Sequence, residues 1–175
     1  VWAPDSKHFA FSWSEPGTPG RGLWVSRSDG EEVRLISNTP SPSVHDIVWV
    51  DANTILSLRG DHLWQTSVSQ GVDLQLMPLE AGASNLSLSP SGKQAAYIRN
   101  GDLWLADLSS KQNRQLTEIG IASLSNLPRG RYSRPEREIG PGIWSGPTYK
   151  WSPDGKTIAI HVVDRREMRK VPFPD

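Results

Sequence analysis

Hydrophobic residues in this chain fall into short runs in which apolar and polar positions largely alternate. Examples of these runs cover residues 9–11, 55–58, 95–97 and 158–160. Alternation at period two is the pattern of a half-buried β-strand, whereas an amphipathic helix repeats about every 3.6 residues. The intervening segments are rich in turn formers, and the chain contains 15 glycines and 14 prolines. The pattern therefore predicts an all-β protein.

The strands belong to a repeating unit of about 40 residues. A Leu-Trp pair occurs at Leu23-Trp24, Leu63-Trp64 and Leu103-Trp104, at a spacing of 40 residues each time. A turn and a short strand precede each pair, and related turns read WAPDSK, WVDAN, LSPSGK and WSPDGK. Adjacent Leu and Trp make both faces of a strand apolar, which predicts burial between stacked sheets. Units of this length are typical of β-propeller blades with four antiparallel strands.

The repeat predicts a partial propeller of about four blades. The expected blades cover residues 1–40, 41–80 and 81–117, a further blade starts over 150–175, and an insert occupies 118–149. An ordinary β-sandwich is the alternative architecture, and the constant spacing argues against it. The chain begins inside the first turn unit, which predicts a segment of a longer protein. Open edges of such a segment favour strand pairing between copies, and hence a homodimer or aggregation.

Composition removes several function classes. The 19 basic and 19 acidic residues give no net charge, so no bulk field favours nucleic acid or an anionic membrane. No apolar run reaches the roughly 20 residues of a membrane span. Without cysteine and with four scattered histidines, no metal site and no cofactor are expected. Composition does not fix the compartment, and a periplasmic or secreted protein is favoured over a cytoplasmic one.

The insert interrupts the rhythm of the repeats. It contains five glycines, four prolines, four arginines and three glutamates, and no strand pattern is expected beyond its first few residues. Long inserts in a rigid scaffold often carry function. Within the insert, Arg137 separates Glu136 from Glu138. These carboxylates form either a solvated charge cluster or a clamp for an ammonium group, since each carboxylate at ~4 Å attracts a cation by about 4 kcal/mol at an effective dielectric near 20.

The end of the chain resembles a known family. The stretch WSPDGKTIAIHVVD is similar to the blade openings of TolB-type and prolyl oligopeptidase-type propellers. The order of acidic insert, YKWSPDGKTIAIHVVD, basic stretch and VPFPD resembles the N-terminal propeller of the dipeptidyl peptidase IV branch of the serine peptidases. The resemblance implies an eight-bladed propeller that caps an α/β-hydrolase domain.

The same resemblance implies a role for the paired glutamates. Glu136 and Glu138 would hold the free amino terminus of a peptide from which a dipeptide is removed. The family's two glutamates are adjacent on a short helix, whereas Arg137 separates them here. On a helix, side chains at i and i+2 would diverge, but on an extended segment they would share a face.

Two functions remain open. The first is the substrate-gating propeller of a serine exopeptidase, with a peptide substrate and a C-terminal α/β-hydrolase domain as partners. Neither 82–86 nor 142–146 fits the Gly-x-Ser-x-Gly elbow, so the catalytic domain is expected outside this chain. The second is a TolB-like, non-enzymatic protein-binding module. The aspartates Asp5, Asp51 and Asp154 are interpreted as turn formers, and Arg165–Lys170 as a solvated edge or a contact with the hydrolase domain.

Overall fold

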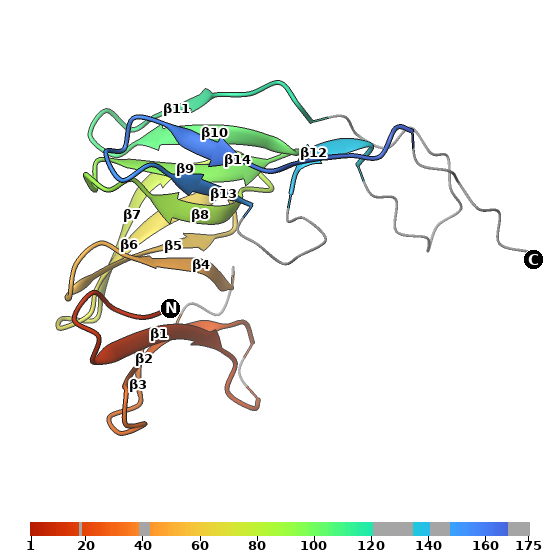
Figure 1. Cartoon of the computed structure of the whole chain (residues 1–175). Helices are drawn as coiled ribbons and strands as arrows, with labels where there is room; N and C mark the ends of the chain where they lie inside the picture. Colours follow the sequence, from red (N-terminus) through yellow and green to blue (C-terminus); the bar gives the residue numbers. More distant parts are fainter. Residues whose placement is uncertain (18, 39–42, 121–134, 141–147, 168–175) are drawn as a thin grey trace, which may run out of the picture.

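The chain folds into stacked antiparallel β-sheets, as a computed structural model shows (Figure 1). The structure describes residues 1–17, 19–38, 43–120, 135–140 and 148–167. Within these ranges every regular element is a β-strand, and no helix is long and apolar enough to cross a bilayer. The all-β prediction is confirmed.

Three sheets follow the order of the repeats. The strands of these sheets are β1 (His8–Trp13), β2 (Gly22–Arg27), β3 (Arg34–Ser37), β4 (Val44–Trp49), β5 (Thr54–Arg59), β6 (His62–Ser67), β7 (Val72–Pro78), β8 (Ser84–Leu88), β9 (Gln94–Arg99), β10 (Asp102–Asp107) and β11 (Gln112–Gln115). They pair as β1-β2-β3, β4-β5-β6-β7 and β8-β9-β10-β11, each strand antiparallel to the next. The four-stranded meander expected of a blade is therefore present in the second and third sheets.

Local turn chemistry joins the strands. The Asp5, Asp51 and Asp154 carboxylates accept hydrogen bonds from the backbone N–H two residues further on, at 2.7–3.1 Å. These contacts are Asx turns, and they confirm the interpretation of the three aspartates as turn formers. At the tight turns between the second and third strands of the units, Gly60 and Gly101 have φ of 59° and 80°.

The hydrophobic core lies between neighbouring sheets. One face of each sheet packs on the next sheet along the chain, and the other face packs on the preceding sheet. Leu23, Leu63 and Leu103, at most 2% exposed, lie in successive cores on the side of the following unit. The first core joins Ala3, Ala10, Leu23, Val25 and Ile36 to Val44, Ile47, Trp49, Ile55 and Val68.

The three repeated tryptophans lie on the opposite face from these leucines. Trp24 is 9% exposed, whereas Trp64 and Trp104 are only half-buried, so the expected full burial holds for one of the three. In each sheet the last residue of the preceding strand covers the ring. Arg59 and Arg99 lie 5.0 and 5.1 Å from the ring centroids of Trp64 and Trp104. Cation–π contact thus completes the packing that an apolar neighbour would otherwise supply.

Tryptophans at the blade-opening turns join the units. The indole N–H of Trp49 donates to the carbonyl of Val1 at 3.1 Å, and that of Trp151 donates to Ser87 Oγ at 2.9 Å. Both bonds run to the preceding unit. The motif therefore fixes one sheet against another, in addition to starting a turn.

The end of the chain adds two small sheets. Strand β13 (Tyr149–Trp151) pairs with β14 (Ile158–Ile160), and β12 (Arg137–Ile139) pairs with β15 (Val162–Asp164). Strand β12 lies inside the insert, so the expectation that this region lacks a strand is wrong there. Tertiary contacts explain the difference, because Ile139 is 2% exposed and its N–H donates to Gly101 O at 2.8 Å. The proposed division into blades and insert remains a prediction.

Candidate recognition site

The predicted carboxylate pair lies on an extended segment beside the third sheet. Glu138 is the central residue of β12, and Glu136 immediately precedes the strand. The segment is therefore strand-like, and residues two apart on a strand share a face. A Cβ on Gly101 would lie only 3.0 Å from Glu138 Cβ, so glycine allows the close approach of the β9–β10 turn to β12. The turn and the strand together define the position of Glu138.

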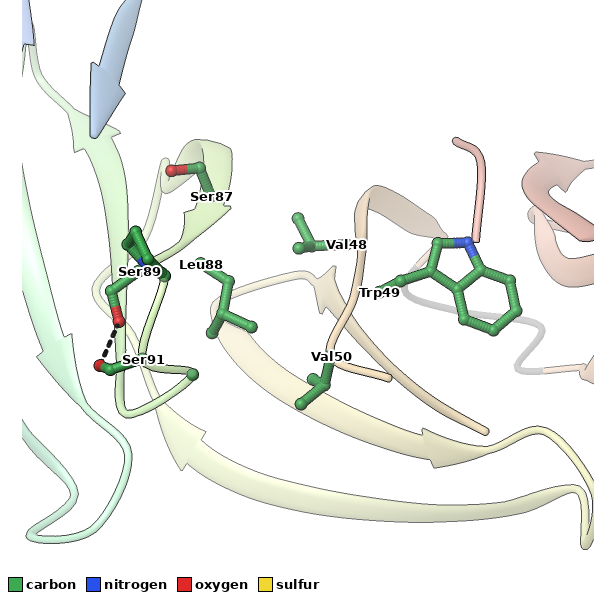
Figure 2. Close-up of a pocket in the computed structure, with 9 residues that line it drawn as sticks. Val48, Trp49, Val50, Ser87, Leu88, Ser89 and Ser91 are labelled. Atoms are coloured by element: carbon green, nitrogen blue, oxygen red, sulfur yellow. Dashed lines mark hydrogen bonds between the residues drawn. The ribbon is translucent and has the colours of Figure 1, made fainter. Parts of the chain in front are cut away.

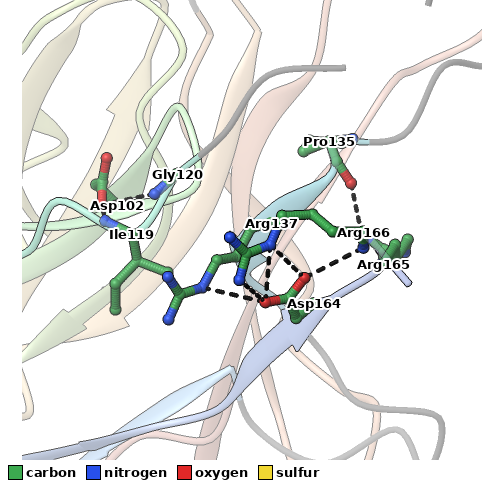
Figure 3. A network of polar contacts seen from close by, with 8 residues as sticks. All are labelled: Asp102, Ile119, Gly120, Pro135, Arg137, Asp164, Arg165 and Arg166. Carbon is green, nitrogen blue, oxygen red and sulfur yellow. Dashed lines mark hydrogen bonds and ion pairs between the residues drawn. The ribbon is translucent and has the colours of Figure 1, made fainter. Parts of the chain in front are cut away.

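Arg165 is the direct partner of Glu138. Its Nη1 lies 2.7 Å from Glu138 Oε1, and the two side chains are 21% and 24% exposed. The same nitrogen donates to the carbonyl of Pro135 at 3.0 Å (Figure 3). The backbone N–H of Arg165 donates to Glu136 O at 2.8 Å. Arg165 therefore holds three consecutive parts of the segment around Glu138.

The Glu136 carboxylate makes no hydrogen bond or ion pair to the residues that the structure describes. It is half-buried, and its charge contributes to raising the pKa of Arg166, after the hydrogen bond and the charge of Asp164. The structure thus places one predicted carboxylate in an ion pair and leaves the other without a counter-ion in the described ranges. The assignment of both residues to an ammonium clamp stays a prediction.

Asp164 organises the basic residues next to the site. Arg166 Nη2 and Nε lie 2.5 and 2.9 Å from its carboxylate, and Arg137 Nε lies 3.6 Å away (Figure 3). Hydrogen bonds from the side chain and then the backbone of Arg166 lower the pKa of Asp164 to about 2. Arg165 and Arg166 are therefore paired within the chain, whereas 168–170 of the basic stretch lie outside the described residues.

Asp102 anchors the start of the insert, a role that sequence reasoning missed. It is 8% exposed, and its Oδ1 accepts hydrogen bonds from Thr117 Oγ1, Ile119 N and Gly120 N at 2.5–3.0 Å. The corresponding residue of the second unit is His62, because each follows the turn directly before Leu-Trp. An aspartate at this position only in the unit followed by the insert was the available signal.

The largest cavity lies at the other end of the strands. It measures about 660 Å³ and is lined by residues 48–50 and 87–92. Figure 2 shows Val48 and Val50 facing Leu88, with Ser89 and Ser91 joined by a hydrogen bond of 3.2 Å. Leu88 pairs with Ala95, whereas Gly101 follows the opposite end of β9. The cavity is therefore separate from the Glu138 site.

The described residues hold no catalytic constellation. No three His, Asp or Glu side chains in them converge on a possible metal position. Ser84, the serine of the first elbow-like string, lies in β8 with its Oγ directed to the carbonyl of Ile98. The second string, 142–146, lies outside the described residues. The chemistry available near Glu138 is thus recognition of a cation.

The stacked meanders with a strand-borne carboxylate site define a β-propeller segment. TolB from Acinetobacter baumannii superimposes with a TM-score of 0.61 at 20% identity, over 87% of this chain and 35% of that one. A puromycin-hydrolyzing peptidase from Mycobacterium tuberculosis gives a TM-score of 0.53 at 19% identity, over 69% and 22% of the two chains. These similarities establish the fold.

Sequence comparison establishes the family. The family described as the dipeptidyl peptidase IV N-terminal region matches residues 41–175, and the chain belongs to it. A dipeptidyl-aminopeptidase B of Aspergillus niger is 28% identical over 142 residues, which are 78% of this chain and 15% of the relative. The chain thus spans about 15% of the length of this curated relative. The resemblance noted in the sequence is confirmed, and the chain is a propeller segment of a peptidase-associated family.

Proposed function

We propose that this chain is the substrate-positioning propeller segment of a serine-type dipeptidyl peptidase, in which Glu136 and Glu138 receive the free amino terminus of a peptide. The observation that carries the proposal is the extended β12 segment, which gives both carboxylates one face beside the third sheet in a chain of this family. An α-ammonium group is a compact cation with three donors, and carboxylate oxygens are its natural acceptors.

Fixing the amino terminus also explains why a dipeptide would be released. An extended peptide advances roughly 3.3–3.6 Å per residue, so an anchored terminus sets which peptide bond reaches a nucleophile at a fixed distance. The nucleophile itself belongs to the α/β-hydrolase domain that the family resemblance implies outside this chain. The propeller segment would contribute binding energy and register.

Hydrolysis by the full-length protein tests the proposal. The substrates are Gly-Pro-p-nitroanilide and its N-acetylated form, which lacks the ammonium group. We expect hydrolysis of the free form, and we expect Glu136→Gln and Glu138→Gln to lower its kcat/KM by roughly 10- to 100-fold, the value of one charged hydrogen bond. Both variants should leave the activity on the acetylated form unchanged.

Glu80→Gln is the matched control. Glu80 also pairs with an arginine, because Arg99 Nη2 lies 2.6 Å from its carboxylate, but it lies on the connection between the second and third sheets. This variant should retain the wild-type preference for the free amino terminus. Unchanged kinetics in both Glu136→Gln and Glu138→Gln would contradict the clamp. A full-length protein without a Gly-x-Ser-x-Gly elbow and without peptidase activity would instead support the protein-binding module.

A further inference from the structure

We infer that Arg165 is a positioning residue for the ammonium site: it holds the Glu138 carboxylate in place and sets the charge of the site to suit a single monocation. This inference rests on the proposed function and adds to it a residue on a different strand. The geometry points to this role because Arg165 contacts the segment around Glu138 at three points, one of them the carboxylate itself.

Glu138 lies in a preformed cradle. On one side is Gly101, where a Cβ would meet Glu138 Cβ at 3.0 Å. On another side is Gly140, where a Cβ would lie 3.3 Å from Glu138 Cγ and 3.4 Å from Cδ. Arg165 Nη1 then fixes Oε1 at 2.7 Å. Two glycines and one guanidinium thus confine the side chain, and confined functional groups lose little entropy when a ligand binds.

One oxygen of this carboxylate remains available. Arg165 engages Oε1, while Oε2 of Glu138 makes no hydrogen bond to the described part of the chain. A carboxylate accepts several hydrogen bonds, so the ion pair with Arg165 leaves acceptor capacity for a further donor. The Glu136 carboxylate lies on the same face of the extended segment. An ammonium group would therefore be received by Glu136 and by the free oxygen of Glu138.

The charge balance favours a monocation. Glu136 and Glu138 contribute two negative charges, and Arg165 neutralises one of them, so the three groups retain one net negative charge. Neutralisation lowers the repulsion between the two carboxylates, which would otherwise raise the cost of ionising both. The remaining charge matches one α-ammonium group and is small for a divalent metal, which usually takes several carboxylate oxygens.

Arginine substitutions in the full-length protein test the inference, with free and N-acetylated Gly-Pro-p-nitroanilide as probes. Arg165→Met removes the guanidinium, and we expect KM for the free substrate to rise about tenfold, with kcat within about twofold. Arg165→Lys keeps the charge but loses the planar donor geometry, so it should recover about half of the loss on a logarithmic scale. The acetylated substrate should respond to neither variant.

Arg99→Met is the matched control. Arg99 is also 21% exposed and also contacts one carboxylate, Glu80, and one carbonyl, Ala81 O. Its loss should leave the ratio of kcat/KM for the free and acetylated substrates at the wild-type value. A general effect of removing a half-buried arginine would appear in both variants, and that result would overturn the positioning role.

Gly140→Ala provides a second test that keeps every charge. The new Cβ at 3.3 Å from Glu138 Cγ should displace the carboxylate and raise KM for the free substrate severalfold. It decides the question if Arg165→Met fails to fold. A normal ratio in Arg165→Met and in Gly140→Ala, with a reduced ratio in Glu138→Gln, would overturn the inference alone. A wild-type protein with no preference for the free amino terminus would overturn the proposed function as well.

Discussion

Individual glycines decide how closely the insert approaches the propeller core. Gly101 ends the β9–β10 turn with φ of 80°, and Glu138 lies directly above it. Gly120, at the start of the insert, would place a Cβ 2.2 Å from Asn100 O. No side chain fits at either position without moving backbone. These contacts are backbone-scale constraints on a site whose chemistry resides in side chains.

Gly101→Ala tests this constraint. A non-glycine residue in the left-handed region costs roughly 1–2 kcal/mol, and the 3.0 Å contact with Glu138 adds to that cost. We expect the free energy of local opening to fall by about 2 kcal/mol. Native-state hydrogen exchange of the Ile139 amide, which donates to Gly101 O, measures it in the full-length protein.

Gly92→Ala is the control for the backbone term. Its φ is 70°, but a Cβ there has no atom within 4 Å. It should leave exchange at Ile139 unchanged, because Gly92 lies in the turn at the other end of β9. Equal exchange rates at Ile139 in the two alanine variants would show that the contact with Glu138 carries no strain.

At the scale of elements, ion pairs at one repeated position stabilise neighbouring strands unequally. Arg59 is fully buried, and its guanidinium makes two hydrogen bonds to Asp73, at 2.7 and 3.0 Å. It also contacts Ser37 of the first sheet and Thr66. Arg99, 40 residues later, meets a Glu80 carboxylate that is 56% exposed. The first pair is a buried network between sheets, and the second is a surface pair.

Stability at low pH should therefore depend on Asp73. Burial alone would raise its pKa, but hydrogen bonds from Arg59, Ser37 and Thr66 outweigh burial and lower the pKa below the ordinary 3.8. The contribution of Asp73 is present above pH 3.8 and is lost as the pH falls through the folded-state pKa. Asp73→Asn should lower the free energy of unfolding by about 3 kcal/mol at pH 7, because Arg59 loses its counter-charge.

The measurement is denaturant unfolding between pH 2 and 7, followed by tryptophan fluorescence. The wild-type curve should decline more steeply below pH 4 than that of Asp73→Asn, since the unfolded state of the wild type binds the additional proton. Glu80→Gln should cost less than about 1 kcal/mol, as expected for an exposed pair. Equal losses in the two variants would contradict the difference in burial.

At the scale of the whole molecule, the outer face of the first sheet lacks the cover that its counterparts have. Phe9, Phe11 and Trp13 occupy the positions of Ile55, Ser57 and Arg59, which the preceding sheet buries. Trp13 is 46% exposed, and Trp2, which stacks on Phe9, is 61% exposed. An aromatic face of this kind favours association with another apolar surface.

The chain of 175 residues expressed alone should accordingly self-associate at micromolar concentration. Replacing Trp2 and Trp13 together by threonine should shift the sedimentation coefficient towards that of the monomer. Leu74→Thr is the control, because Leu74 is 57% exposed on β7, away from this face. A monomeric wild type, or equal sedimentation of the wild type and the double variant, would contradict this prediction and with it the predicted dimer through this face.

The sequence by itself determined the features that local chemistry controls. Alternation at period two, Asx turns and the spacing of Leu23, Leu63 and Leu103 suffice to predict strands, hairpins and stacked units, because each depends on residues a few positions apart. The carboxylates Glu136 and Glu138 were also identifiable as candidates. Their residue types stand out in a glycine- and proline-rich insert.

Only the tertiary structure decided what those carboxylates contact. Strand β12 has no apolar alternation of its own and exists because β15 and the Gly101 turn supply its hydrogen-bond partners. The pairing of Glu138 with Arg165 joins residues 27 positions apart, and Asp102 reaches 17 residues ahead to Ile119. Such contacts follow from how sheets stack in space, and no periodicity along the chain encodes them.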